Sequence, residues 1–159
     1  MTSPEKIYYS YEDIHNLVRK VAKKIKNDNY EPDVMIAVAG GGYIPARILR
    51  NEFKKPLIGI SMNYYNENDE IQEKANIYQW VTQEEVRDKK ILIVDEVDDT
   101  RKTLHYIIEH IKQLQPKEIG IAVLNNKMKT KKPFEVDGIH YYCAETNEDK
   151  WIVYPWDNY

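Results

Sequence analysis

Blocks of hydrophobic and polar positions predict helices and strands in turn along the chain. Ser10, with Asp13 three residues later, is typical of a helix start, and a helical apolar pattern follows it. Pro45, which suits a first helical turn, opens a second helical pattern. A third pattern follows Thr103. The apolar positions of the first and third are Ile14, Leu17, Val18, Val21 and Ile25, then Leu104, Ile107, Ile108, Ile111 and Leu114.

Short apolar runs rich in β-branched residues lie between the helical segments and predict strands. The runs are residues 34–38, 57–60, 77–81, 91–94, 120–124 and 139–144. Strands that alternate with helices indicate crossover units around a mostly parallel central sheet flanked by helices. We therefore expect an α/β fold, and a length of 159 residues fits a single domain, 1–159.

The stretch 91–103 carries the most chemical information. An apolar run of four residues, typical of a buried parallel strand, ends abruptly in charge. Ligands bind in open α/β sheets at the carboxyl ends of the strands, which is where this charge falls. The polar residues are Asp95 and Glu96, then Asp98 and Asp99, then Thr100, Arg101, Lys102 and Thr103.

The residue types in this stretch suit a phosphorylated sugar. Hydroxyl and backbone N–H groups of 100–103, at a helix N-terminus, can bind a phosphate. Ionised Asp95 and Glu96 only accept hydrogen bonds, which suits a sugar diol or a hydrated Mg²⁺. Asp99 lies between these features and can act as a proton acceptor. An acidic, solvated turn without a ligand is the alternative, but four acids followed by Thr-x-x-Thr favour the ligand site.

Two further segments are candidates on weaker grounds. Ala39, Gly40, Gly41 and Gly42 follow a predicted strand, so their backbone N–H groups can approach an anion, although an ordinary tight turn explains them as well. Near the C-terminus, Lys127 can donate to an exocyclic carbonyl and Trp151 offers a flat face to a ring. On these residues alone, a solvated basic loop and a packed tryptophan remain the simpler interpretation.

Composition narrows the class of protein. A net charge of −3 argues against broad nucleic-acid binding, and no stretch approaches the ~20 apolar residues of a membrane span. The N-terminus lacks the apolar region of a signal peptide, and the one cysteine, Cys143, excludes an internal disulfide. We expect a cytoplasmic protein. The four histidines are dispersed and predict no zinc site.

The stretch 95–103 resembles the signature of the type I phosphoribosyltransferases. That signature is an apolar strand, two acids, two mostly apolar residues, and Asp-Thr-Gly-x-Thr. The chain has Asp95-Glu96, Val97-Asp98 and Asp99-Thr100-Arg101-Lys102-Thr103. Asp98 replaces a usual apolar residue and Arg101 replaces the usual glycine. Arg101 either affects the loop geometry, because glycine reaches backbone angles that are costly for other residues, or adds positive charge beside the phosphate.

The C-terminal region resembles the 6-oxopurine branch, in its short xanthine-guanine form. That form ends in Trp-Ile-x-x-Pro-Trp-Asp, which Trp151-Ile152 and Pro155-Trp156-Asp157 reproduce. Its members also carry a lysine after the preceding strand, where Lys127 stands here. The resemblance implies a base-binding hood, 125–159, in which Lys127, Trp151 and Ile152 bind the base.

The resemblance also implies the remaining roles. Phosphoribosyl diphosphate would bind with its ribose and 5′-phosphate at Asp95, Glu96 and 98–103, and with its pyrophosphate at 39–42. Asp95, Glu96 and Asp157 would hold Mg²⁺, and Asp99 would be the catalytic residue. The polar stretch 66–76 would be a flexible loop that closes over the site, with Tyr64 and Tyr65 at its base; a solvated hairpin is the alternative.

The implied function is purine salvage: transfer of the 5-phosphoribosyl group from phosphoribosyl diphosphate to N9 of hypoxanthine, guanine or xanthine, with formation of the nucleoside monophosphate. The family also implies a homo-oligomer, and the 13 tyrosines agree with one. Two alternatives stay open: a regulator that senses phosphoribosyl diphosphate, and a phosphoribosyltransferase for a pyrimidine or a carboxylated ring. An interaction-only protein would leave the acidic signature unexplained.

Overall fold

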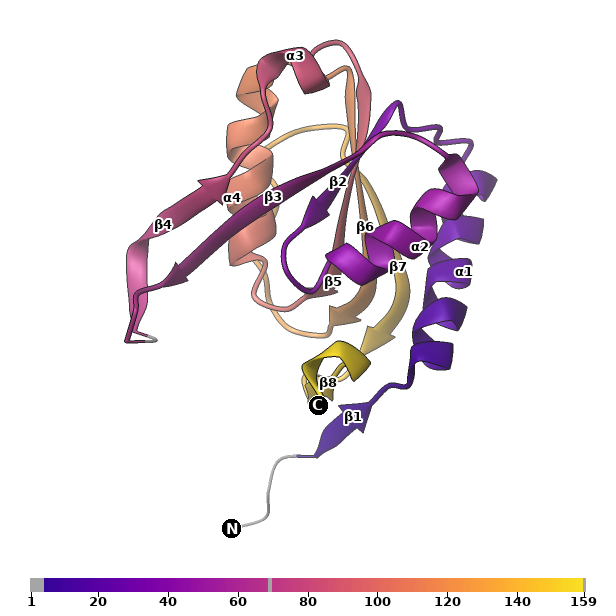
Figure 1. The fold of residues 1–159 in the computed structure, drawn as a ribbon, viewed down its shortest axis with the longest axis vertical. Helices are drawn as coiled ribbons and strands as arrows, with labels where there is room; N and C mark the ends of the chain where they lie inside the picture. Colours follow the sequence, from indigo (N-terminus) through magenta and orange to yellow (C-terminus); the bar gives the residue numbers. More distant parts are fainter. Residues whose placement is uncertain (1–4, 69, 159) are drawn as a thin grey trace.

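A six-stranded sheet forms the centre of the computed structural model, which describes residues 5–68 and 70–158 (Figure 1). The sheet has the order β4-β3-β2-β5-β6-β7. β4 is antiparallel to β3, and all other neighbours are parallel. The strands are β2 (Val34–Val38), β3 (Leu57–Tyr65), β4 (Ile71–Gln79), β5 (Lys90–Asp98), β6 (Glu118–Lys127) and β7 (His140–Asn147). The predicted α/β class is confirmed.

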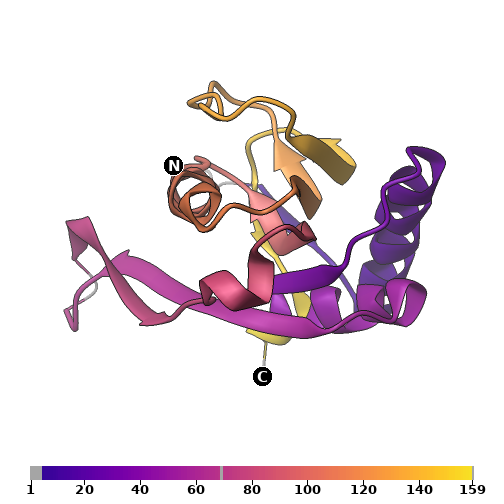
Figure 2. The same cartoon turned by 90° about the horizontal axis from the view of Figure 1, so that it is seen from above.

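Helices cover both faces of the sheet (Figure 2). One face packs on α1 (Tyr11–Asn27) and α2 (Tyr43–Phe53), and the other on α4 (Lys102–Ile111), which continues into the 3-10 turn η1 (Lys112–Leu114). The short α3 (Gln83–Val86) precedes β5. Successive residues of β5 serve the two cores in turn, since Leu92 and Val94 join the first and Ile91 and Ile93 the second.

Helix α1 begins where the sequence pattern predicts it. Ser10 and Asp13 form a reciprocal capping box: Asp13 N donates to Ser10 Oγ over 3.1 Å, and Ser10 N donates to Asp13 Oδ2 over 2.8 Å. The buried residues of α1 include all five predicted apolar positions. None of the helices in the described part of the chain is long and apolar enough to cross a membrane.

The predicted loop 66–76 is wrong in its extent, because its second part is a strand. β4 begins at Ile71, so only 66–70 connect β3 to β4, and residue 69 lies outside the described residues. β4 is an edge strand with mostly exposed side chains, paired through Ile77 opposite Met62 and Asn76 opposite Asn63. Such a strand has no apolar face to bury, so its polar sequence looks like a loop.

A second, two-stranded sheet lies beyond the carboxyl ends of the central strands (Figure 1). β1 (Lys6–Tyr8) pairs in parallel with β8 (Trp151–Val153), and the 3-10 turn η2 (Pro155–Asp157) follows. The N-terminal segment therefore supports the C-terminal region that the sequence predicts to bind the base.

Candidate active site

The adjacent acids Asp95 and Glu96 lie near the carboxyl end of β5. Asp95 is 8% exposed, and the amide of Glu96 donates to Asp95 Oδ1 over 2.8 Å. Burial, and then repulsion by Glu96, raise the pKa of the Asp95 carboxyl well above its usual range. Among the described residues, Glu96 Oε2 is buried without a hydrogen-bond partner. Two crowded carboxylates with an unsatisfied oxygen fit a ligand that brings a cation or hydroxyl donors.

Glycines 40–42 allow the turn after β2 to approach these acids closely. A Cβ atom at Gly41 would overlap the Glu96 carboxylate, and one at Gly42 would lie 2.5 Å from the Val38 carbonyl oxygen. A Cβ at Gly40 would meet nothing within 4 Å. Gly42 is therefore required sterically, and a side chain at Gly41 would displace the Glu96 carboxylate, which the sequence pattern alone did not establish.

A cavity of about 410 Å³ joins the predicted phosphoribosyl and pyrophosphate segments. Its walls come from the glycine turn, from β5, from the start of α4 and from the β3–β4 hairpin, including Tyr64 and Tyr65. The predicted site residues that line it are Ala39, Gly40, Gly41, Asp95, Glu96, Thr100, Lys102 and Thr103. Three segments from separate parts of the sequence thus meet at one edge of the sheet.

The N-terminus of α4 faces this cavity through Thr100, Lys102 and Thr103. The amide of Lys102 donates to Thr100 Oγ1 over 3.4 Å, and Lys102 Nζ lies 4.1 Å from the centroid of the Tyr64 ring. Arg101 precedes the helix in the left-handed region, with φ 69°. The amides of a first helical turn have no acceptor within the helix, and they make this turn, with its positive helix end, suitable for a phosphate.

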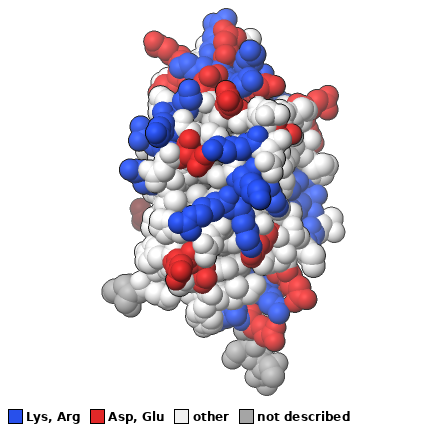
Figure 3. All heavy atoms as spheres, turned by 90° about the vertical axis from the view of Figure 1, so that its right-hand side faces the viewer, with Lys and Arg blue, Asp and Glu red and all other residues white. Residues whose placement is uncertain are grey.

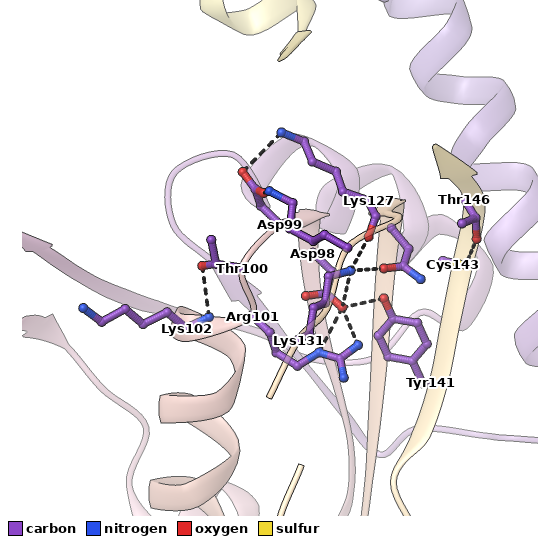
Figure 4. Close-up of polar contacts among 12 residues, drawn as sticks. Asp98, Asp99, Thr100, Arg101, Lys102, Lys127, Lys131, Tyr141, Cys143 and Thr146 are labelled. Carbon is purple, nitrogen blue, oxygen red and sulfur yellow. Dashed lines mark hydrogen bonds and ion pairs between the residues drawn. The ribbon is translucent and has the colours of Figure 1, made fainter. Parts of the chain in front are cut away.

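The side chains of Asp98 and Arg101, both assigned by the resemblance to the phosphoribosyl site, bind each other (Figure 4). Arg101 Nη2 donates to Asp98 Oδ2 over 2.7 Å, and Arg101 Nε donates to the same oxygen over 3.1 Å. The Asp98 side chain is fully buried, and a buried carboxylate needs a cation or donors nearby. Tyr141 also donates to Asp98 Oδ2, over 2.7 Å. In the structure, the two side chains therefore serve each other, and their contact with a phosphoribosyl group stays a prediction.

A second polar cluster lies where β6 ends. Lys127 Nζ donates to Asp99 Oδ2 over 3.2 Å, and Lys129 Nζ donates to the other oxygen of the same carboxylate. Burial raises the pKa of Asp99, but the hydrogen bonds from Lys129 and Lys127 outweigh it, so the pKa lies below its usual value. Asp149 shares the two lysines, at 3.0 Å from Lys129 Nζ and 3.9 Å from Lys127 Nζ.

The structure brings Trp151 to this cluster. Its ring centroid lies 6.0 Å from Lys127 Nζ, and the side chain is 63% exposed. A tryptophan this exposed is not packed in the core, and exposed aromatic side chains are typical of recognition sites. Lys127 therefore lies close to both Asp99 and Trp151.

Ile152, which the resemblance assigns to the base site, turns its side chain into the core, so its part in base binding would have to come from its backbone. Ile152 is 7% exposed and belongs to the core that packs on α1 and α2, because its pairing with Ile7 turns it inward. Asp157 is exposed in η2. The turn lies near the acid pair, since the hydroxyl of Tyr154 donates to the Glu96 carbonyl oxygen over 3.2 Å.

Several residues of the site were not predicted. Lys129 and Lys131 looked like part of a solvated basic loop. In the structure, Lys129 binds Asp99, and Lys131 Nζ lies 3.7 Å from Asp98 Oδ2. Asn125 is fully buried: it donates to Asn147 Oδ1 over 2.7 Å and accepts from the Tyr154 hydroxyl over 2.7 Å. The sequence signal for Asn125 was a polar residue inside a predicted strand.

A family model matches the chain over nearly its whole length. The model for the phosphoribosyl transferase domain matches residues 8–158. The chain belongs to the phosphoribosyl transferase family, as the resemblance of its motifs predicts.

Relatives narrow the group further. The chain is 37% identical to the hypoxanthine-guanine phosphoribosyltransferase of Saccharomyces cerevisiae, over 99% of this chain and 88% of the relative. It is 36% identical to xanthine phosphoribosyltransferase 1 of the same yeast, over 99% and 92%.

Two solved structures are similar over nearly the whole chain. A hypothetical protein from Neisseria gonorrhoeae, crystallised with bound ppGpp, is 39% identical with a TM-score of 0.88, over 99% of this chain and 92% of that one. A purine phosphoribosyltransferase from Pyrococcus horikoshii is 34% identical with a TM-score of 0.77, over 97% and 95%.

Proposed function

We propose that the protein transfers the 5-phosphoribosyl group of phosphoribosyl diphosphate to N9 of a 6-oxopurine, with release of pyrophosphate. The observation that carries this proposal is the placement of Lys127 between Asp99 and Trp151. A lysine can donate to the exocyclic O6, an indole can stack on the purine, and a carboxylate can accept a ring proton. Names of the yeast relatives, which refer to hypoxanthine-guanine and xanthine, support the same substrate class.

Phosphoribosyl diphosphate would bind in the 410 Å³ cavity. Its 5′-phosphate would lie at Thr100, Lys102 and Thr103, its ribose hydroxyls at Asp95 and Glu96, and its pyrophosphate along 39–42. Bound Mg²⁺ would neutralise charge on the pyrophosphate. The acid pair fits this ion because Glu96 Oε2 lacks a partner among the described residues, and Asp157 would approach it from η2.

Chemistry at C1 of the ribose would develop positive charge, which nearby carboxylates stabilise. Lys127 would leave Asp99 to donate to O6 when the purine binds. Loss of that hydrogen bond would raise the pKa of Asp99 and make it a better proton acceptor, because the lysines now hold that pKa low. Binding of the purine would therefore turn Asp99 into the stronger proton acceptor that the reaction needs.

A phosphoribosyltransferase for another ring is the nearest alternative. Adenine presents an amino group, a donor, to Lys127, and a pyrimidine offers less ring surface to Trp151, so the two residues together favour a 6-oxopurine. Hypoxanthine, guanine and xanthine share the O6 that Lys127 would bind, and we propose activity on one or more of them.

Regulation by a nucleotide is a second candidate, favoured by the Neisseria structure with bound ppGpp. That molecule combines phosphates with a 6-oxopurine, the two chemistries for which the two clusters of this site are suited. We propose that it competes with phosphoribosyl diphosphate here.

A regulator that also binds nucleic acid is less well supported. Figure 3 shows Lys and Arg gathered on the face that carries α1. Several of these side chains are already engaged: Lys20 pairs with Glu145 at 2.9 Å, Lys26 pairs with Glu52, and Lys24 donates to the Cys143 carbonyl oxygen over 2.7 Å.

We propose a cytoplasmic enzyme that forms a homo-oligomer.

Initial rates of pyrophosphate release test the function. Purified protein, Mg²⁺ and phosphoribosyl diphosphate are mixed separately with hypoxanthine, guanine, xanthine, adenine, uracil and orotate. Turnover with one or more 6-oxopurines alone supports the proposal. Turnover only with uracil or orotate would assign another base, and binding of phosphoribosyl diphosphate without any turnover would favour the regulator.

A further inference from the structure

Asp98 and Arg101, the two residues at which the chain departs from the family signature, are partners. The signature has an apolar residue and a glycine at these positions, whereas this chain has a buried acid and a base joined by two hydrogen bonds of 2.7 and 3.1 Å. Each departure alone would be costly: a buried carboxylate without a cation, or a non-glycine residue in a left-handed turn. Together, the two residues compensate each other.

The Arg101 side chain packs between aromatic rings and is mostly buried. Its guanidinium lies 4.4 Å from the centroid of the Phe134 ring and 5.4 Å from that of Tyr141, and the side chain is 16% exposed. Burial lowers the pKa of Arg101, but the hydrogen bond and the charge of Asp98 raise it by more. The pKa is therefore raised overall, and the guanidinium stays charged. The two guanidinium hydrogen bonds with the shortest distances go to Asp98, which makes direct binding of a phosphate the less favourable use of the charge.

The pair also connects the phosphate turn to the base cluster. Lys131 Nζ lies 3.7 Å from Asp98 Oδ2, and it donates to the Lys127 carbonyl oxygen over 2.7 Å and to the Asn126 side chain. Asp98 of β5 is in register with Asn126 of β6. Asp98 therefore contacts both the turn that enters α4 and the segment that carries Lys127 (Figure 4).

We propose that Arg101 is a positioning residue. Its guanidinium, held by Asp98, fixes the left-handed turn at φ 69° and so orients the amides and hydroxyls of 100–103 toward the 5′-phosphate. It replaces the conformational freedom of the family glycine with a salt bridge. The inference rests on the proposed phosphoribosyl site, and its alternative is that Arg101 contacts the phosphate itself.

Four variants separate the two roles: Arg101→Ala, Arg101→Gly, Asp98→Asn, and the double variant Asp98→Asn/Arg101→Gly. Asparagine keeps an acceptor for the Tyr141 hydroxyl and removes the buried charge, and glycine adopts the turn without strain. Arg87→Ala, at an exposed position before β5, is the charge-matched control. For each protein, calorimetry gives the Kd of ribose 5-phosphate, and steady-state rates give separate KM values for phosphoribosyl diphosphate and for the purine.

A positioning role predicts that Arg101→Ala raises the Kd of ribose 5-phosphate and the KM of phosphoribosyl diphosphate by about tenfold or more, because a displaced turn misplaces several donors. The purine KM should change less. Arg101→Gly should be intermediate, since it relieves the turn but leaves Asp98 without its guanidinium. The double variant should return to within about threefold of the wild type, which is the non-additivity expected of coupled residues.

Direct phosphate binding predicts instead that every variant without the guanidinium loses affinity equally, whatever residue stands at 98. Equal losses in Arg101→Gly and in the double variant would overturn the proposal. If Arg101→Gly does not fold, Asp98→Asn and the double variant still decide, because only a positioning role makes the double variant bind ribose 5-phosphate nearly normally. Ribose 5-phosphate binding does not depend on the purine, so a wild type that binds it without turnover would contradict the proposed reaction while this comparison still tests Arg101.

Discussion

Lys127 Nζ and Asp99 Oδ2 are 3.2 Å apart, so the group that would bind the base and the group that would accept its proton neutralise each other before a substrate arrives. Lys129 strengthens the arrangement from the other side of the carboxylate. The site is thus electrostatically balanced without a purine, and the purine must take over the donor that now serves Asp99.

Asp99→Asn should lower kcat by about 100-fold or more, because an amide cannot accept the ring proton, and should change the KM of phosphoribosyl diphosphate little. Asp149→Asn is the matched control: it removes a carboxylate from the same lysines, at 3.0 Å from Lys129, and should change kcat by less than about threefold. Steady-state kinetics with both substrates varied measures the split. A kcat of Asp99→Asn equal to that of the wild type would remove Asp99 from the mechanism.

The lowered pKa of Asp99 has a pH consequence with a defined sign. A carboxyl whose pKa is lower in the folded state stabilises the fold above its unfolded pKa, and this contribution is lost as the pH falls through the folded value. The Tm difference between wild type and Asp99→Asn should therefore be constant around neutral pH and shrink only below the ordinary aspartate range. Thermal melts across pH check this; a difference that shrinks near neutral pH would contradict the lysine contacts.

The pKa of Asp95 is shifted in the opposite direction to that of Asp99. Burial and Glu96 raise its pKa, so its contribution to stability is complete below the unfolded pKa and is lost as the pH rises through the folded value. Asp95→Asn should stabilise the protein without ligands at neutral pH by about 1 kcal/mol, or about 2–4 °C in Tm, and should do so increasingly as pH rises.

The same substitution should impair function. Addition of Mg²⁺ and phosphoribosyl diphosphate should raise the Tm of the wild type much more than that of Asp95→Asn, because only the wild type keeps both carboxylates. Thermal melts with and without these ligands measure both effects. If Asp95→Asn were less stable alone yet stabilised equally by the ligands, the acid pair would have a structural role only.

The three glycines of the turn after β2 give a graded series. Gly42→Ala places a Cβ at 2.5 Å from one backbone oxygen and 2.6 Å from another, which cannot yield, and should destabilise the protein by about 3 kcal/mol or more. In Gly41→Ala the nearest neighbour of the new Cβ is the Glu96 carboxylate, which can move, so the substitution should cost about 1 kcal/mol while weakening phosphoribosyl diphosphate binding. Gly40→Ala meets nothing and is the control for stability. Chemical denaturation ranks the three; a different order would contradict this packing.

Trp151→Ala should raise the KM of the purine by about tenfold through loss of stacking, with little effect on the KM of phosphoribosyl diphosphate. Because the indole is 63% exposed, the free energy of unfolding should change by less than about 0.5 kcal/mol. Trp151→Phe keeps an aromatic face and should recover part of the affinity. A large loss of stability with an unchanged purine KM would make Trp151 a packing residue.

The parts of the fold and the site that local sequence encodes could be predicted. The apolar run before Asp95 predicts both the buried strand and the place where it ends, and the Ser10 capping box marks the start of α1. The position of the phosphate turn follows from the same contiguous stretch, because a strand, a turn and a helix specify one another at short range.

Features that depend on contacts distant in sequence could not be predicted. Ile152 is turned into the core by pairing with Ile7, and Lys129 is drawn from a basic loop to Asp99. The first part of β4, before Ile77, was missed because an exposed edge strand needs no apolar face. Asp98 and Arg101 were recognised as departures from the signature, but their contact depends on the burial of Asp98 and its hydrogen bond from Tyr141, which no local pattern shows.

The most direct test of the account is product analysis of a competition in one vessel. Phosphoribosyl diphosphate, Mg²⁺ and equal amounts of hypoxanthine, guanine, xanthine, adenine, uracil and orotate are incubated with the protein, and the nucleotides formed are identified by mass. We predict nucleoside monophosphates of one or more 6-oxopurines, one pyrophosphate for each nucleotide, and none from the other bases. Nucleotides of adenine or a pyrimidine alone, or none at all, would contradict the assignment of Lys127, Asp99 and Trp151 to a 6-oxopurine site.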